Sequence, residues 1–185
     1  MALFSLPPQK VEMVLLALLA LAAIFDIRGR RIPNWLTLSG VLLGFLINTL
    51  IGPPEGGFLF ALEGFLAGFG VYMVLYILRA MGAGDVKLMA AVGALAGWQR
   101  WFGIFLITAI VGGAMALLLV TLRRRLGKTL WNVGFILSEL GHGRPAYAGK
   151  EELDVRSPRA VGLPHGAVIA IGTVFYLAAA LRLSR

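Results

Sequence analysis

The sequence predicts an all-α polytopic membrane protein, on three observations. Hydrophobic residues make up 59% of the 185 residues and charged residues 14%, whereas an ordinary soluble domain has about 45–50% apolar and about 25% charged residues. The apolar residues are gathered in long blocks, and most Lys and Arg residues fall between the blocks. This composition excludes a soluble enzyme, a disordered tail and a nucleic-acid-binding domain. We therefore interpret the formal net charge of +8 as a signal of membrane topology.

Six apolar blocks predict a bundle of six transmembrane helices, because a spanning helix needs about 20 mostly apolar residues. The blocks are, in order, roughly 11–25, 35–51, 58–78, a short one at 86–98, 101–122 and 162–181. Neither a tandem repeat nor a second domain is evident, so the whole chain, 1–185, is predicted to form one transmembrane domain.

Two turns are predicted between the blocks. Residues 52–57 are rich in Gly and Pro and predict a tight turn between the second and third blocks. Gln99 and Arg100 stand between Trp98 and Trp101, a pattern that predicts a short interfacial turn between the fourth and fifth blocks.

The one sizeable polar segment covers residues 123–160. Apolar residues recur in it at helical spacing beside Trp131, which predicts a short helix lying on the membrane surface. These residues are Leu130, Val133, Ile136, Leu137 and Leu140. Residues 141–160 are rich in Gly, Pro and charge, and we predict that they are mobile.

The distribution of basic residues predicts the orientation in the membrane. Thirteen of the 17 Lys and Arg residues fall in the segments after the first, third and fifth blocks. Since Lys and Arg are enriched in cytoplasmic loops, these three segments are predicted to be cytoplasmic and both termini external.

Three acids stand at or within apolar blocks, where charge is costly and function is the first hypothesis. Asp26 closes the first block and Asp85 opens the fourth, both on the predicted cytoplasmic side. Because the fourth block is too short to cross the whole hydrocarbon core, Asp85 is predicted to lie below the surface, in a recess. Glu63 lies near the opposite side, and we expect it to be packed, protonated or snorkelling.

Two carboxylates facing one recess are the minimum set for aspartic-protease chemistry. Two such groups about 3 Å apart hold a single proton, so one can activate water while the other polarises the scissile carbonyl. Gly82 and Gly84, just before Asp85, allow close approach of an extended substrate. Two structural alternatives stay open. In the first, Asp26 only forms an ion pair with a neighbouring arginine, Arg28 or Arg30. In the second, Asp85 serves only as a helix cap.

No metal or cofactor is predicted. The sequence has no cysteine and two histidines, which gives no metal-ligand pattern. His142 is expected to be solvated, and for His165 a structural role is favoured over one in the recess.

Two motifs resemble those of the type IV prepilin peptidases, which are GxGD aspartic peptidases. Residues 26–34 (DIRGRRIPN) are similar to the first motif, an aspartate followed by Ile-Pro-Asn. Residues 82–88 (GAGDVKL) are similar to the second, GxGD followed by Val-Lys-Leu. Residues 163–166 (LPHG) are similar to a third, weaker element, in which the family usually has an aromatic residue where His165 stands.

The resemblance implies an aspartic endopeptidase of the bacterial inner membrane. It would remove the basic leader from prepilins or pseudopilins at the cytoplasmic face, with the bilayer as its other partner and no nucleic acid. Catalysis is carried over onto Asp26 and Asp85. The residues that would support it are Gly82, Gly84, Lys87, Pro33 and Asn34. For Lys87, orientation of Asp85 and snorkelling to lipid headgroups both stay open.

The resemblance points to the short, peptidase-only form associated with tight-adherence (Flp) pili, without N-methyltransferase activity. Two other classes stay open: a small proton-coupled transporter and a non-catalytic membrane assembly protein. A transporter would favour acids near the bilayer midplane, where neither aspartate is predicted to lie. The pilin and the oligomeric state are left open by the sequence.

Overall fold

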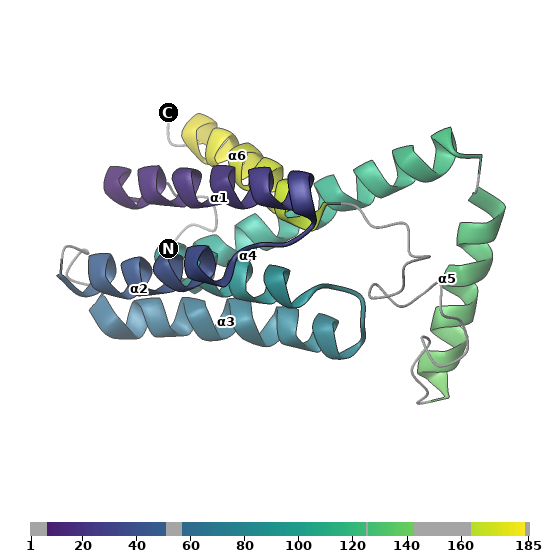
Figure 1. The fold of residues 1–185 in the computed structure, drawn as a ribbon, viewed down its shortest axis with the longest axis horizontal. Helices are drawn as coiled ribbons and strands as arrows, with labels where there is room; N and C mark the ends of the chain where they lie inside the picture. Colours follow the sequence, from purple (N-terminus) through teal and green to yellow (C-terminus); the bar gives the residue numbers. More distant parts are fainter. Residues whose placement is uncertain (1–6, 51–56, 125, 143–163, 184–185) are drawn as a thin grey trace.

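The computed structural model describes residues 7–50, 57–124, 126–142 and 164–183. All regular secondary structure in these ranges is α-helical, which confirms the predicted all-α fold (Figure 1). The helices are, in chain order, α1 (Gln9–Gly29), α2 (Asn34–Leu50), α3 (Gly57–Ile77), α4 (Ala83–Leu122), α5 (Leu126–Gly141) and α6 (His165–Leu183).

Helix α4 joins the predicted fourth and fifth blocks and is broken at Gly97. This residue has φ 77° and ψ 163°, which lies outside the helical region and is a conformation that glycine adopts far more readily than other residues. The predicted turn at Gln99 and Arg100 is therefore wrong by two residues, because both are helical and the break lies at the preceding glycine. We call residues 83–96 the first arm of α4 and residues 98–122 its second arm.

The first arm packs backbone to backbone against α3. A Cβ atom placed on Gly64 would overlap the carbonyl group of Gly93, and one placed on Gly93 would overlap that of Gly64. One turn further along the arm, and one turn back along α3, Gly97 lies against the ring of Phe60. Residue numbers therefore rise along one helix as they fall along the other, so the two run antiparallel. Small residues at such contacts are typical of helix pairs in membranes.

Beyond the break the chain runs back alongside α3. The rings of Tyr72 and Phe105 meet edge to face with centroids 6.2 Å apart, so the second arm is parallel to α3. Figure 1 shows this reversal as the change from the short teal half of α4 to the longer green half. The two arms thus act as two separate helices of the bundle.

Helix α6 runs antiparallel to the second arm. Thr108 packs against Gly172, and Val168 packs against Gly112 one turn further along the arm. This brings the start of α6 to the end of the bundle where the second arm finishes.

The carbonyl groups left free by the break are satisfied from α2. Asn48 is 3% exposed, and its Nδ2 donates to the carbonyl oxygens of Ala94 at 2.8 Å and Leu95 at 3.2 Å. It also donates to Gly44 in its own helix at 3.0 Å. Because carbonyls at a helix end have no partner within the helix, a buried end needs such donors. Asn48 thus stabilises the end of the first arm.

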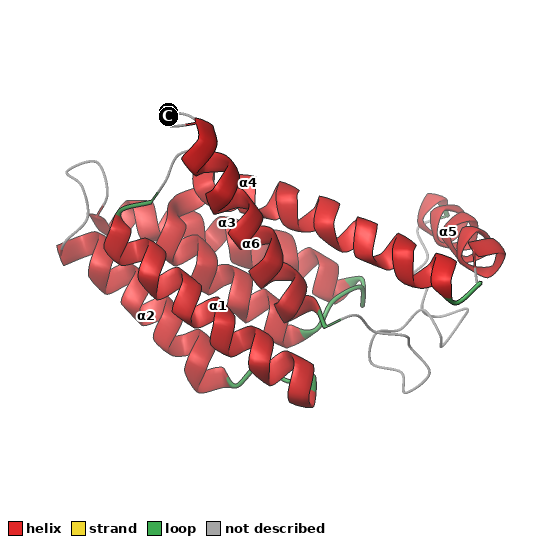
Figure 2. Cartoon of the chain, turned by 90° about the horizontal axis from the view of Figure 1, so that it is seen from above, coloured by secondary structure: helices red, strands yellow, loops and turns green. Residues whose placement is uncertain are grey.

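Helix α5 stands apart from the other helices, beyond the end of the second arm (Figures 1 and 2). It confirms that a helix follows the fifth apolar block. Leu130 and Trp131, from its predicted membrane-facing set, are 69% and 74% exposed. Its position on a membrane surface stays a prediction.

The number of membrane spans also stays a prediction. Among the described residues, α3, α4 and α6 are long and apolar enough to cross a membrane, and α2 is a shorter apolar helix. A helix covers most of the described residues of each of the six predicted apolar blocks, with the fourth and fifth joined in α4. Most of the predicted turn at 52–57 and of the segment 141–160 lies outside the described residues.

Candidate active site

Three helix ends gather both aspartates at one end of the bundle. Asp26 lies in the last turn of α1, Asp85 in the first turn of α4, and Gly166 in the first turn of α6. The aspartates are 7% and 8% exposed, so both carboxylates are buried at this end of the bundle. Burial of a carboxylate is costly unless it is hydrogen-bonded, so its partners decide what it can do.

The carboxylate of Asp26 is held by the start of α6. The backbone N–H of Gly166 donates to its Oδ2 at 2.7 Å. The first N–H groups of a helix have no partner within the helix and readily bind an anionic group. A Cβ atom on Gly166 would lie 3.1 Å from both Cβ and Oδ2 of Asp26, so the absence of a side chain permits this approach.

The carboxylate of Asp85 is held by the loop that precedes α4. Gly82 is the N-cap residue with extended backbone, and its N–H donates to Oδ2 of Asp85 at 3.1 Å. Asp85 therefore does cap its helix, as the structural alternative predicted. The cap does not compete with a chemical role, since the same bond fixes where the carboxylate lies.

Ile32 packs between the segment that carries Asp85 and the segment that binds Asp26. Its side chain lies against Gly84, and its Cδ1 would be 3.2 Å from a Cβ atom on Gly166. An apolar side chain is thus wedged between the first turn of α4 and the first turn of α6. This contact joins the first predicted motif to the second and to the weaker third element.

Three ionisable side chains lie within electrostatic range of Asp85. Asp26 and His165 act on its carboxylate, and Asp85 acts in turn on Tyr72 of α3, which is 2% exposed. The structure therefore brings together the two acids that the sequence singled out. His165 belongs to this group as well, while His142 lies elsewhere, on the exposed end of α5, with its Nδ1 2.7 Å from the carbonyl oxygen of Ser138.

Lys87 joins the two motifs by a second route. Its Nζ donates to Oδ1 of Asn34 at 2.8 Å, across 53 residues of chain. Asn34 is the first residue of α2, and the carbonyl of Pro33 accepts the N–H groups of Leu36 and Thr37 in the first turn. Lys87 is thus bonded to the start of α2.

Glu63 lies away from the aspartates. It is exposed on α3, beside Gly64, at the level of the bundle where the first arm ends. No group of three or more His, Cys, Asp or Glu residues that could hold a metal occurs within the described ranges. Within the described residues, two buried carboxylates, one imidazole and one phenol gather at this end of the bundle.

Sequence reasoning missed three contributors to this site. Gly166 stood in the weaker third motif, but nothing in that motif identifies its N–H as the partner of Asp26. Tyr72 and Ile32 each fall within or beside an apolar stretch, where a core role is the ordinary interpretation. A tyrosine within an apolar block was the available signal, because a buried hydroxyl usually needs a polar neighbour.

A model of a known protein family matches more than half of this sequence. Residues 13–117 match the model described as "Type IV leader peptidase family", a range that includes Asp26 and Asp85. The chain belongs to the type IV leader peptidase family.

Curated relatives agree with the family match. A prepilin leader peptidase/N-methyltransferase of Pectobacterium carotovorum subsp. carotovorum is 30% identical over 122 residues, which are 60% of this chain and 42% of the relative. Proteins of the same name match from Klebsiella pneumoniae, 37% identical over 92 residues (47% and 40%), and from Escherichia coli K12, 34% identical over 110 residues (56% and 48%). The matches thus span less than half the length of these relatives. No solved structure matches this chain.

Proposed function

We propose that this chain is an aspartic endopeptidase that removes the short basic leader from prepilins or pseudopilins, with Asp26 and Asp85 as the catalytic pair. The observation that carries the proposal is that two buried carboxylates from distant segments lie at one end of the bundle, where Ile32 contacts both Gly84, beside Asp85, and Gly166, which binds Asp26. Both fall within the residues matched to the leader peptidase family. The names of the relatives supply the substrate class.

The pair would work by sharing one proton. Two like charges about 3 Å apart resist double ionisation, so in the working pair one carboxylate would be ionised and the other protonated. The ionised group takes a proton from water, whose oxygen forms a bond to the scissile carbonyl carbon, while the protonated group donates a hydrogen bond to the carbonyl oxygen. Collapse of the tetrahedral intermediate breaks the C–N bond, and the proton taken from water passes to the leaving amine.

The hydrogen bonds described above would preorganise this chemistry. Asp26 is fixed by Gly166 and Asp85 by Gly82, each through a backbone N–H that does not depend on side-chain rotamers. Catalytic groups held in place before the reaction reduce the reorganisation needed in the transition state. Gly82 and Gly84 would let an extended substrate strand approach this end of the bundle.

The proposed location is the cytoplasmic face of the bacterial inner membrane, with both termini external. Arg28 follows Asp26 within one turn and Arg123 follows the second arm, so basic residues flank the end of the bundle that holds the aspartates. Lys and Arg mark cytoplasmic loops. A substrate with a cytoplasmic basic leader and an apolar helix presents its junction at this surface. The chain would act as a single transmembrane peptidase domain.

We propose the peptidase reaction alone and not the N-methyltransferase reaction that the names of the relatives also include. The family match covers both aspartate motifs, which are the residues that the peptidase reaction would use. The short form associated with tight-adherence pili is the proposed type. A methylation assay on the cleaved pilin would reveal a bifunctional enzyme.

Processing of a co-expressed prepilin tests the catalytic pair. Asp26→Asn and Asp85→Asn should each leave the leader uncleaved, while Glu63→Gln, a matched acid-to-amide change away from the pair, should process normally. Normal processing by either aspartate variant would refute the assignment. Cleavage of the same prepilin by the purified chain separates an enzyme from an assembly protein or a transporter.

A further inference from the structure

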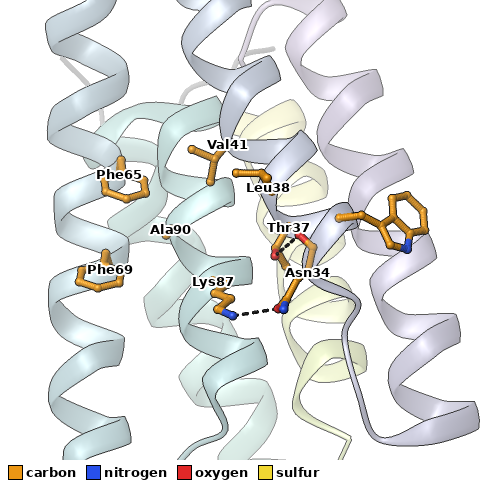
Figure 3. A pocket seen from close by; sticks show the side chains of 9 residues that line it. Asn34, Thr37, Leu38, Val41, Phe65, Phe69, Lys87 and Ala90 are labelled. Atoms are coloured by element: carbon orange, nitrogen blue, oxygen red, sulfur yellow. Dashed lines mark hydrogen bonds between the residues drawn. The ribbon is translucent and has the colours of Figure 1, made fainter.

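A lateral groove opens between α2, α3 and the first arm of α4 (Figure 3). Its volume is about 680 Å³, within the roughly 300–1,000 Å³ that ligand sites occupy. The side chains that define its walls are Leu38 and Val41 from α2, Phe65 and Phe69 from α3, and Lys87 and Ala90 from α4. The walls are almost wholly apolar.

The groove is separate from the catalytic pair. Successive residues of a helix are about 100° apart, so Lys87 points to nearly the opposite side of the first arm from Asp85. In agreement, Asp85 is buried, whereas Lys87 is exposed and bonds to α2. A ligand in the groove would therefore not occupy the space between the aspartates.

One end of the groove differs chemically from the rest. Lys87 is the single charged side chain among the described residues that line it, and its ammonium group lies at the end where α2 begins, bonded to Asn34 (Figure 3). Trp35, 60% exposed, lines the same end. Amphipathic aromatic side chains and lysines are characteristic of the headgroup level of a bilayer. The groove thus has an apolar length and a cationic, interfacial end.

We propose that this groove binds one acyl chain of an anionic phospholipid, with the headgroup phosphate at Lys87. Charge complementarity selects this occupant, since an apolar chain that carries a negative group at one end matches both parts of the groove. A basic peptide leader does not match, because its charges would meet the ammonium group of Lys87. The inference does not depend on the proposed peptidase function.

The phosphate would sit where the two motifs meet. Lys87 has three N–H donors and spends one on Asn34, so it can hold an anionic oxygen without releasing α2. A bound phospholipid would then connect the start of α2 with the first turn of α4. The lipid would stabilise the end of the bundle that carries Asp85 without contacting the carboxylates of the catalytic pair.

Lipid retention by the purified full-length chain tests the site. The chain is incubated in detergent with phosphatidylglycerol or phosphatidylcholine, and bound lipid is counted by native mass spectrometry. Both lipids carry the phosphate, but the choline ammonium of phosphatidylcholine cancels the headgroup charge and is repelled by Lys87. We therefore expect about tenfold preference for phosphatidylglycerol. Lys87→Gln should abolish the preference, and Lys87→Arg should keep it. Equal retention of the two lipids by the unaltered chain, or an unchanged preference in Lys87→Gln, would overturn the proposal.

The apolar part of the groove has its own matched pair of variants. Leu38→Trp fills the groove and should lower retention of phosphatidylglycerol. Leu42→Trp lies one turn further along α2, is equally exposed in the unaltered chain at 61% against 59%, and does not line the groove. It should retain lipid as the unaltered chain does. Equal retention by both variants would overturn the assignment to this groove, as would a photoreactive residue at position 38 that captured a second copy or a prepilin in membranes.

Discussion

The backbone N–H of Gly166 donates a 2.7 Å hydrogen bond to Oδ2 of Asp26, across 140 residues of chain. The start of α6 thus binds a side chain in the last turn of α1. Because the partner is a backbone group, the position of the carboxylate depends on how closely α6 approaches α1. Gly166 is the residue that sets this approach, since a Cβ atom there would meet Asp26 and Ile32.

Gly166→Ala should therefore impair cleavage while the chain still folds. The added Cβ atom would lie 3.1 Å from Oδ2 of Asp26, so the carboxylate or the start of α6 must shift by tenths of an ångström. A displacement of about 1 Å at a catalytic group can cost about 100-fold, so we expect a loss of roughly tenfold in kcat/KM on a prepilin peptide. Gly113→Ala, with open space around its Cβ position, is the control and should keep full activity. Equal kcat/KM for both variants would show that the contact does not position Asp26.

The cap and the catalytic role of Asp85 can be separated by two substitutions. Asp85→Asn keeps an oxygen that accepts the N–H of Gly82, whereas Asp85→Ala removes it. Loss of such a cap costs about 1 kcal/mol, so only Asp85→Ala should lower the free energy of unfolding in detergent. Both variants should fail to cleave prepilin. Activity retained in Asp85→Asn but lost in Asp85→Ala would assign the residue to capping alone.

Asn48→Leu should destabilise the bundle without touching the aspartates. It leaves the buried carbonyl groups of Ala94 and Leu95 without the donor that Asn48 supplies. An unsatisfied buried polar group costs about 1–3 kcal/mol, which thermal or denaturant unfolding in detergent would detect. Ser39→Ala is the control in the same helix, because its hydroxyl donates only to Leu36 one turn away. Matching stability of the two variants would contradict this role of Asn48.

The contact between α3 and the first arm predicts a strict requirement for glycine. Gly64→Ala or Gly93→Ala would drive a methyl group into the facing backbone, which cannot move aside as a side chain can. Overpacking typically costs about 1–3 kcal/mol and more where backbone must shift. Gly70→Ala, on the same helix as Gly64 but with open space, should change the unfolding midpoint little. Because alanine favours a helix more than glycine does, a midpoint lowered equally by Gly70→Ala would show that the close contact at Gly64 and Gly93 is not the cause.

The sequence predicted α1 to α4 and α6 because each falls on an apolar block, and α5 because apolar residues recur there at helical spacing. It also placed Asp26 and Asp85 at the same end of the bundle, from topology alone. Their roles as catalysts stay predictions that the proposed assay addresses.

What the sequence did not predict depends on tertiary contacts. The aromatic and polar residues at 98–101 suggested the turn, yet the backbone breaks at Gly97, where φ is positive and Phe60 leaves no room for a side chain. The role of Asn48 was not predicted, because its hydrogen-bond partners, Ala94 and Leu95, lie in a distant part of the sequence. The bond from Gly166 to Asp26 joins opposite ends of the chain, and no spacing rule connects them.

The backbone conformation of Gly97 also decides which helices the second arm of α4 can contact. Without the break, the 40 residues of α4 would form a continuous rod of about 60 Å, twice the thickness of a hydrocarbon core. The second arm would then continue away from α3, and Thr108 and Gly112 would lie far from their partners Gly172 and Val168 on α6. Gly97 contacts neither aspartate, yet the reversal of chain direction at this residue allows the last helix to pack beside the first.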